Sequence, residues 1–289
     1  MKKKIILIAL LSFILFNITG CFENNNLEGA NIKTSTYPVE YLITRLYGEN
    51  TTITSIYPNG TSVSTYDLTE KQIKTFAKDT DLFVYNGLTK EKEIAKKILN
   101  ENKKMQIIDV SYGIKYHYGV EELWLNPNNF LMLANTVKTD LIELSANKYA
   151  AEDIEKNYET LEEDLSILDT ELRNIAENSE KTKSNVIVVA NDSFGFLNEY
   201  GFEVINISNE NNITSSIKNK FKNKEYNHIL VKDGEEVKDA IRDLVDNYDA
   251  TLVKVDTMET LSDNQRKNND NYLSIMNDFI TNIGNITLK

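Results

Sequence analysis

The stretch AAEDIEKNYETLEEDLSILDTELRNIAENS, residues 150–179, decides the fold of this chain. Seven apolar residues recur in it alternately four and three positions apart, which places them on one stripe of a helix. They are Ile154, Tyr158, Leu161, Leu165, Leu168, Leu172 and Ile175. No Pro or Gly interrupts residues 150–193. We therefore expect a stiff helix over residues 146–180 that packs on a core, and the short repeat disfavours a free coiled coil.

Short apolar runs alternate with longer amphipathic stretches on both sides of this helix, which is typical of α/β units with mainly parallel sheets. We expect an N-terminal lobe over residues 32–145 with strands at 53–57, 82–85 and 106–110 and helices at 69–78 and 91–100. A helix launched by Asn126-Pro127 should complete this lobe. The C-terminal lobe, residues 181–289, should contain strands at 186–190, 203–207, 229–231 and 252–255 and helices at 213–221, 235–246 and 270–283.

The N-terminus has the order of features of a lipoprotein signal peptide. A basic start at residues 1–4 precedes an apolar run at residues 5–16 and the small-residue box that ends at Cys21. The run is shorter than the ~20 residues of a transmembrane helix. We expect residues 1–20 to be removed and the acylated Cys21 to hold the protein on the lipid bilayer at the extracytoplasmic face. The polar, Asn-rich residues 21–31 should be a flexible tether.

Charge and cysteine content exclude several classes. The formal net charge is −12, and loss of residues 1–20 removes three lysines and no acid, which leaves −15. Such an acidic chain is not suited to nucleic acid, whose binding depends on clustered Lys and Arg. A single cysteine allows neither an intramolecular disulfide nor a Cys-rich zinc site.

Seven short motifs follow the predicted signal peptide along the chain. They are Thr36-Tyr37-Pro38, SIYPNG at 55–60, DLFVYNG at 81–87, DVSYGIK at 109–115, WLNPNN at 124–129, DSFGFLNEYG at 192–201 and YLSIMN at 272–277. With them the chain, from about residue 32 onward, resembles the solute-binding lipoproteins of zinc and manganese ABC importers of the cluster A-I type. The resemblance implies two lobes joined by a long rigid helix, as in periplasmic binding proteins with a helical backbone. It also implies a divalent metal ion, Zn or Mn, as the transported ligand, and an ABC permease and its ATPase as partners.

The same resemblance implies four metal-ligand positions, of which three are changed. The three positions that hold histidine in the family fall on Ser64, Glu122 and Asn191, while the acidic fourth ligand is retained as Glu259. Hydroxyl, amide and carboxylate oxygens suit harder ions than imidazole does. We therefore expect an oxygen-rich metal site that is closer to Mn or Ca chemistry than to tight zinc capture.

A cleft that has lost its metal is the alternative interpretation. Loop Ser and Asn side chains often bond only to nearby backbone, and a Glu on an acidic protein is commonly just solvated. On this interpretation the chain is a surface binding or adhesion lipoprotein that keeps the scaffold.

The two histidines do not decide between these interpretations. His117 is either a replacement ligand or a lone loop residue, and His228 opens a predicted strand. The sequence contains no paired nucleophile motif, no phosphate-binding Gly-rich loop and no HExxH helix, so we do not expect an enzyme. We expect a monomer.

Overall fold

The computed structural model describes residues 27–48, 51–145 and 147–288, and it contains two four-stranded parallel sheets. The signal peptide, Cys21 and most of the predicted tether lie outside the described residues. No helix of the described part is long and apolar enough to span a bilayer.

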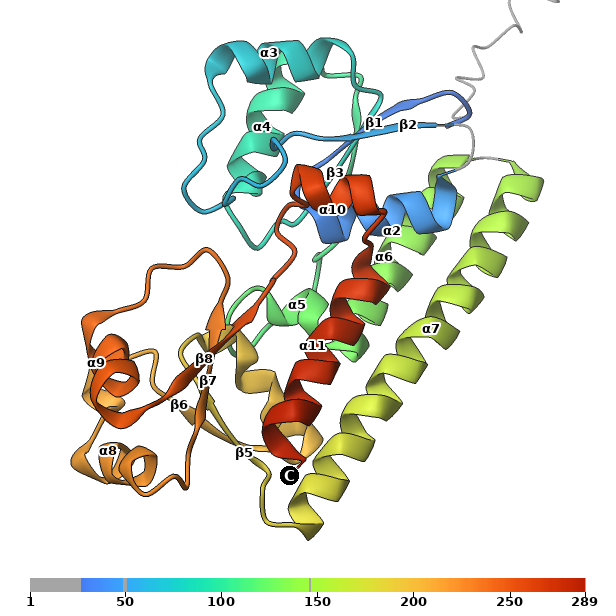
Figure 1. The fold of residues 1–289 in the computed structure, drawn as a ribbon. Coiled ribbons are helices and arrows are strands. Elements are labelled where there is room, and N and C mark those ends of the chain that lie inside the picture. Colours follow the sequence, from blue (N-terminus) through green and yellow to red (C-terminus); the bar gives the residue numbers. More distant parts are fainter. Residues whose placement is uncertain (1–26, 49–50, 146, 289) are drawn as a thin grey trace, which may run out of the picture.

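The first sheet forms the upper lobe of Figure 1 and has the order β2-β1-β3-β4. Its strands are β1 (Asn31–Thr34), β2 (Thr52–Ser55), β3 (Leu82–Tyr85) and β4 (Gln106–Asp109). The helices that connect them are α2 (Tyr37–Tyr47), α3 (Glu70–Lys78) and α4 (Glu91–Glu101). Helix α3 begins where the sequence dictates, because Thr69 and Gln72 form a capping box.

The second sheet repeats this arrangement with the order β6-β5-β7-β8. Its strands are β5 (Val186–Val189), β6 (Glu203–Asn206), β7 (His228–Lys232) and β8 (Thr251–Val255). The 3₁₀ segments η1 (Asp192–Tyr200) and η2 (Glu210–Asn212) and the helices α8 (Ser215–Lys222) and α9 (Asp239–Tyr248) surround it.

Three long helices connect the lobes along one side of the molecule (Figure 1). They are α6 (Pro127–Ser145), α7 (Lys148–Lys181) and α11 (Tyr272–Thr287), and both α6 and α11 pack against α7. Five residues of the predicted stripe on α7 are at most 2 % exposed, and Tyr158 and Ile175 pack against the same core. The fold class of two parallel α/β lobes with a long linking helix is therefore confirmed.

Strand β1, helix α2 and helix α10 (Asp263–Asn268) were not among the expected elements. The short helix α5 (Glu122–Leu125), which lies between the lobes, was also not expected. The division into residues 1–20, 21–31, 32–145, 146–180 and 181–289 stays a prediction.

Part of the predicted C-terminal lobe returns to the first lobe. After β8 the chain bonds to the loop that follows β2, with Gly60 N donating to Leu261 O at 2.9 Å. The guanidinium of Arg266 in α10 forms a bidentate ion pair with Glu40 of α2 at 2.7 and 2.9 Å. A bidentate pair fixes orientation as well as distance, so α10 is clamped to the first lobe.

Candidate functional site in the interlobe cleft

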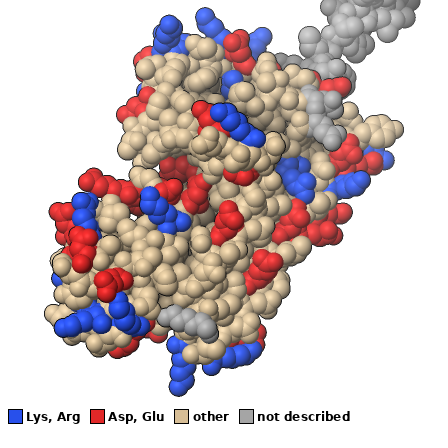
Figure 2. Space-filling model, in the orientation of Figure 1, with Lys and Arg blue, Asp and Glu red and all other residues tan. Residues whose placement is uncertain are grey.

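The loops that follow the carboxyl ends of β2, β5, β7 and β8 meet between the lobes. Ligands of open α/β sheets bind at the carboxyl ends of the strands, at the point where the connections from two neighbouring parallel strands run to opposite sides of the sheet. The loops enclose a cavity of about 630 Å³ whose polar lining includes Ser64, Asn191, Lys232 and Glu259. Figure 2 shows acidic side chains gathered around this hollow. Three of the four residues predicted from the sequence, Ser64, Asn191 and Glu259, therefore share one cavity.

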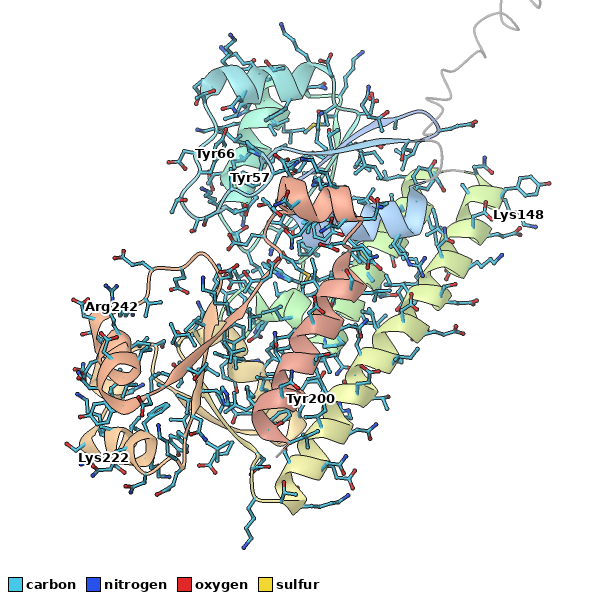
Figure 3. The ribbon with its side chains drawn as sticks, in the orientation of Figure 1. Tyr57, Tyr66, Lys148, Tyr200, Lys222 and Arg242 are labelled. Carbon is cyan, nitrogen blue, oxygen red and sulfur yellow. The ribbon has the colours of Figure 1, made fainter. Side chains whose placement is uncertain are left out.

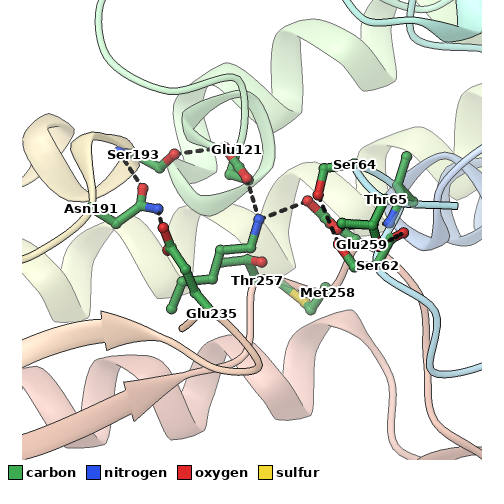
Figure 4. Close-up of polar contacts among 12 residues, drawn as sticks. Ser62, Ser64, Thr65, Glu121, Asn191, Ser193, Glu235, Thr257, Met258 and Glu259 are labelled. Carbon is green, nitrogen blue, oxygen red and sulfur yellow. Dashed lines mark hydrogen bonds and ion pairs between the residues drawn. The ribbon is translucent and has the colours of Figure 1, made fainter. Parts of the chain in front are cut away.

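The ammonium group of Lys232 lies between two carboxylates at the centre of the site. Its Nζ is 2.6 Å from Oε1 of Glu121 and 2.7 Å from Oε1 of Glu259 (Figure 4). The three side chains are only 10 to 16 % exposed. Lys232 is the last residue of β7 and so belongs to the second lobe. The sequence interpretation missed both Lys232 and the role of Glu121.

The Glu121 carboxylate is held by two residues of the second lobe, Lys232 and Ser193. Its Oε2 accepts a 2.6 Å hydrogen bond from the Ser193 hydroxyl at the start of η1. Gly119 makes this approach possible, because a Cβ at that position would collide with the Ser193 hydroxyl. The next turn is fixed by Trp124, whose indole donates to Thr257 O at 2.7 Å, while Tyr272 donates to Trp124 O at 2.7 Å.

Glu259 lies in the loop after β8 but is attached to the first lobe. Its backbone oxygen accepts from Tyr37 N at 2.9 Å, and its Oε2 accepts from Val63 N at 3.1 Å. The neighbouring Met258 adopts a left-handed conformation with φ of 55°, which is rare for a long side chain. The backbone is thus turned so that the Glu259 carboxylate meets Lys232.

The charges of this triad stabilise one another. Burial by itself would raise the pKa of Glu121, but Lys232 and the hydrogen bonds from Lys232 and Ser193 outweigh burial and lower this pKa. Burial would likewise lower the pKa of Lys232, yet Glu121 and Glu259 outweigh it and raise this pKa. Near neutral pH the site therefore holds a lysine cation beside a Glu121 anion.

Glu122 does not reach this cavity, although we expected it there. Its carboxylate is turned to the preceding loop, where it accepts from His117 N and Tyr118 N at 2.7 Å each. Successive residues of a helical turn point about 100° apart, so only one of Glu121 and Glu122 can face the cleft. Glu122 is 1 % exposed and stabilises the loop, while the His117 side chain is exposed.

Ser64 and Asn191 border the cavity with local partners. The Ser64 hydroxyl shares a 2.9 Å hydrogen bond with that of Ser62. The Asn191 side chain accepts from Ser193 N at 2.9 Å and donates to Glu235 Oε2 at 2.9 Å. Asn191 therefore caps η1, which is the local role that loop Asn residues commonly take.

The cavity is rich in oxygen donors, and the carboxylates of Glu121 and Glu259 meet at one cation, the Lys232 ammonium. Within the described residues, no group of three or more His, Cys, Asp or Glu side chains is arranged to hold a metal ion. Glu121 and Glu259 supply two carboxylates that already share one cation, and the hydroxyls of Ser62, Ser64 and Ser193 lie around them. Oxygen donors of this kind are suited to hard cations.

Another buried carboxylate, that of Glu91 at the start of α4, lies in the first lobe. It accepts a 2.8 Å hydrogen bond from the Tyr57 hydroxyl, and Tyr57 contacts Tyr66 edge-on with ring centroids 6.2 Å apart (Figure 3). Its Oε2 has no hydrogen-bond partner among the described residues. Burial is the main reason why the pKa of Glu91 is raised.

A family model described as the zinc-uptake complex component A, periplasmic, matches residues 32–286. The chain belongs to this family. It is therefore a solute-binding component for metal uptake by an ABC importer, and the predicted family and this role are confirmed. A comparison with curated protein sequences finds no significant match.

Several solved structures share the fold. The Zn(II)-bound ZnuA-like domain of Streptococcus pneumoniae AdcA is 22 % identical with a TM-score of 0.72, and the alignment covers 90 % of this chain and 99 % of that one. The metal-dependent lipoprotein YcdH from Bacillus subtilis is 19 % identical, with a TM-score of 0.73 and coverage of 90 % and 100 %. The periplasmic zinc binding protein TroA from Treponema pallidum is 16 % identical, with a TM-score of 0.69 and coverage of 90 % and 99 %.

Proposed function

We propose that this chain is the cargo receptor of an ABC importer and that it holds a divalent cation, of the zinc or manganese type, at Glu121 and Glu259. The observation that carries the proposal is the convergence of these two carboxylates on one cationic group between the lobes. A site that already attracts a cation is electrostatically suited to a cationic cargo. Ser64 and Asn191 remain candidates for outer ligands, and the position of Glu122 favours a supporting role.

The partners follow from the family. An uptake component that binds cargo outside the cytoplasm must release it to a permease, and the energy comes from the ATPase of the importer. We propose that acylated Cys21 anchors the receptor beside this permease on the bilayer. A Cys21→Ser variant should then appear in the soluble extracellular or periplasmic fraction instead of the membrane fraction. We interpret the chain as a transport component and not as an enzyme, because cargo binding is the function of the family.

Calorimetry tests the cargo proposal. We expect Mn²⁺ or Zn²⁺ to bind the purified, chelator-treated protein, and we expect Glu121→Gln and Glu259→Gln to weaken binding by at least about tenfold, since each removes a charged ligand. Glu163→Gln is the matched control, because it removes one carboxylate from an exposed position of α7 that does not line the cavity. Wild-type protein that binds neither ion at millimolar concentration would contradict the proposal and favour a receptor scaffold without metal.

A further inference from the structure

The Lys232 ammonium has the position and the contacts that a cationic cargo would need. It is contributed by the second lobe, whereas Glu259 is attached to the first lobe through Tyr37 N and Val63 N. Glu121 lies between them, just before α5. One cation thus joins carboxylates from different parts of the cleft, as a bound metal ion would.

The oxygen atoms of both carboxylates are already engaged. Glu121 uses Oε1 for Lys232 and Oε2 for Ser193, while Glu259 uses Oε1 for Lys232 and Oε2 for Val63 N. A metal ion would need oxygen ligands at about 2.0–2.6 Å. The two carboxylate oxygens lie 2.6 and 2.7 Å from Nζ, so a metal between them would take the place that Nζ occupies. Metal and ammonium therefore exclude each other.

The Lys232 side chain is largely buried, which distinguishes its ion pairs from exposed pairs on the protein surface. Lys232 is 16 % exposed on its side chain, in contrast to Lys254 on the adjacent strand, which is 67 % exposed and pairs with Asp233 at 3.3 Å. An exposed pair of the latter kind contributes little, whereas a largely buried ammonium needs both carboxylates to compensate its lost hydration. The site is built around this cation.

We propose that Lys232 is a tethered cation that occupies the cargo position, so that the cleft is bridged without cargo and a metal ion binds only by displacing the ammonium. This inference rests on the proposed function, since it assumes that Glu121 and Glu259 are the cargo ligands. It predicts that cargo affinity is set by competition with a group of the protein itself. Removal of the ammonium should therefore tighten metal binding, although no ligand is added.

The test compares metal binding by wild type, Lys232→Met and Lys232→Gln. Met keeps an unbranched apolar stem without the charge, and its side chain is one heavy atom shorter than that of Lys. Gln keeps a hydrogen-bond donor in case the Met variant folds poorly. Lys254→Gln is the control, because it removes one positive charge from the neighbouring strand and leaves the triad intact. Mn²⁺ and Zn²⁺ are titrated separately into chelator-treated protein by calorimetry, and circular dichroism verifies the fold.

We expect both Lys232 variants to bind at least one of the ions about 100-fold more tightly than wild type, a change of about 2.7 kcal/mol. Lys254→Gln should bind as wild type does. If wild type binds no metal and the Lys232 variants do, the inference holds and the proposed cargo of the natural chain fails. If wild type and folded Lys232 variants bind equally, the inference is overturned while the cargo proposal stands. If none binds, both are overturned.

Discussion

Replacement of Lys232 by Met should cost this protein a measurable part of its stability. The substitution removes two charge-assisted hydrogen bonds, of 2.6 and 2.7 Å, and leaves two largely buried carboxylates facing each other. Each such bond contributes roughly 1.5–3 kcal/mol. Breaking a buried ion pair on one side costs about 3–5 kcal/mol. Because the side chains keep 10 to 16 % exposure, we expect the lower end, about 3 kcal/mol.

Equilibrium unfolding in urea measures this loss. Trp124 is the only tryptophan and is 3 % exposed beside the cleft, so its fluorescence follows the region that contains the triad. Circular dichroism should give the same transition if the two lobes unfold together. Lys254→Gln, which breaks an exposed pair, should stay within about 0.5 kcal/mol of wild type. A Lys232→Met protein as stable as this control would refute the assignment of Lys232 as the cation around which the cleft is built.

Three further substitutions test other parts of the structure. Because burial raises the folded-state pKa of Glu91, the free energy of unfolding of wild type should rise relative to that of Glu91→Gln as the pH falls from 7 toward 4.5. Urea unfolding at several pH values measures this, and a difference between the two proteins that stays constant with pH would contradict the prediction. Gly119→Ala should lower the free energy of unfolding by about 1–3 kcal/mol and weaken metal binding more than Ser193→Ala does. The new Cβ at position 119 would push the Ser193 side chain away in addition to breaking the hydrogen bond from Ser193 to Glu121, whereas Ser193→Ala only removes that bond. Tyr272→Phe should cost about 1–3 kcal/mol, since it leaves the buried Trp124 carbonyl without its donor, and an unchanged urea midpoint would argue against that hydrogen bond.

Elements whose own residues show a clear hydrophobic pattern were predicted from the sequence. The strands β3, β5 and β7 contain apolar runs and α7 has its stripe, so each was located within one or two residues. Strand β1 was missed because its four residues, NIKT, contain a single large apolar side chain, Ile32. Its strand character comes from pairing with β2 and β3 on both sides, which is a long-range property.

The candidate site was predictable by region but not by atom. The resemblance to the solute-binding family implied the positions Ser64, Asn191 and Glu259, and the structure brings these three residues to one cavity. The choice between Glu121 and Glu122 depends on the rotation of one helical turn, which adjacent identical residues do not reveal. A signal for Lys232 was present, because a lysine that ends an apolar strand beside the point where β5 and β7 diverge faces a ligand site in this kind of sheet.

The backbone of the cleft is positioned by residues other than those that face the cargo. Trp124 and Tyr272 fix the turn that carries Glu121, and Tyr37 N fixes the loop that carries Glu259. Ser64 is exposed, so its side chain can change at little cost to folding, whereas Asn191 is half-buried and caps η1. A family scaffold can therefore keep its two lobes and long helix while the side chains that line its cleft change. For this reason the cargo of this chain must be argued from Glu121, Lys232 and Glu259, and the fold alone does not determine it.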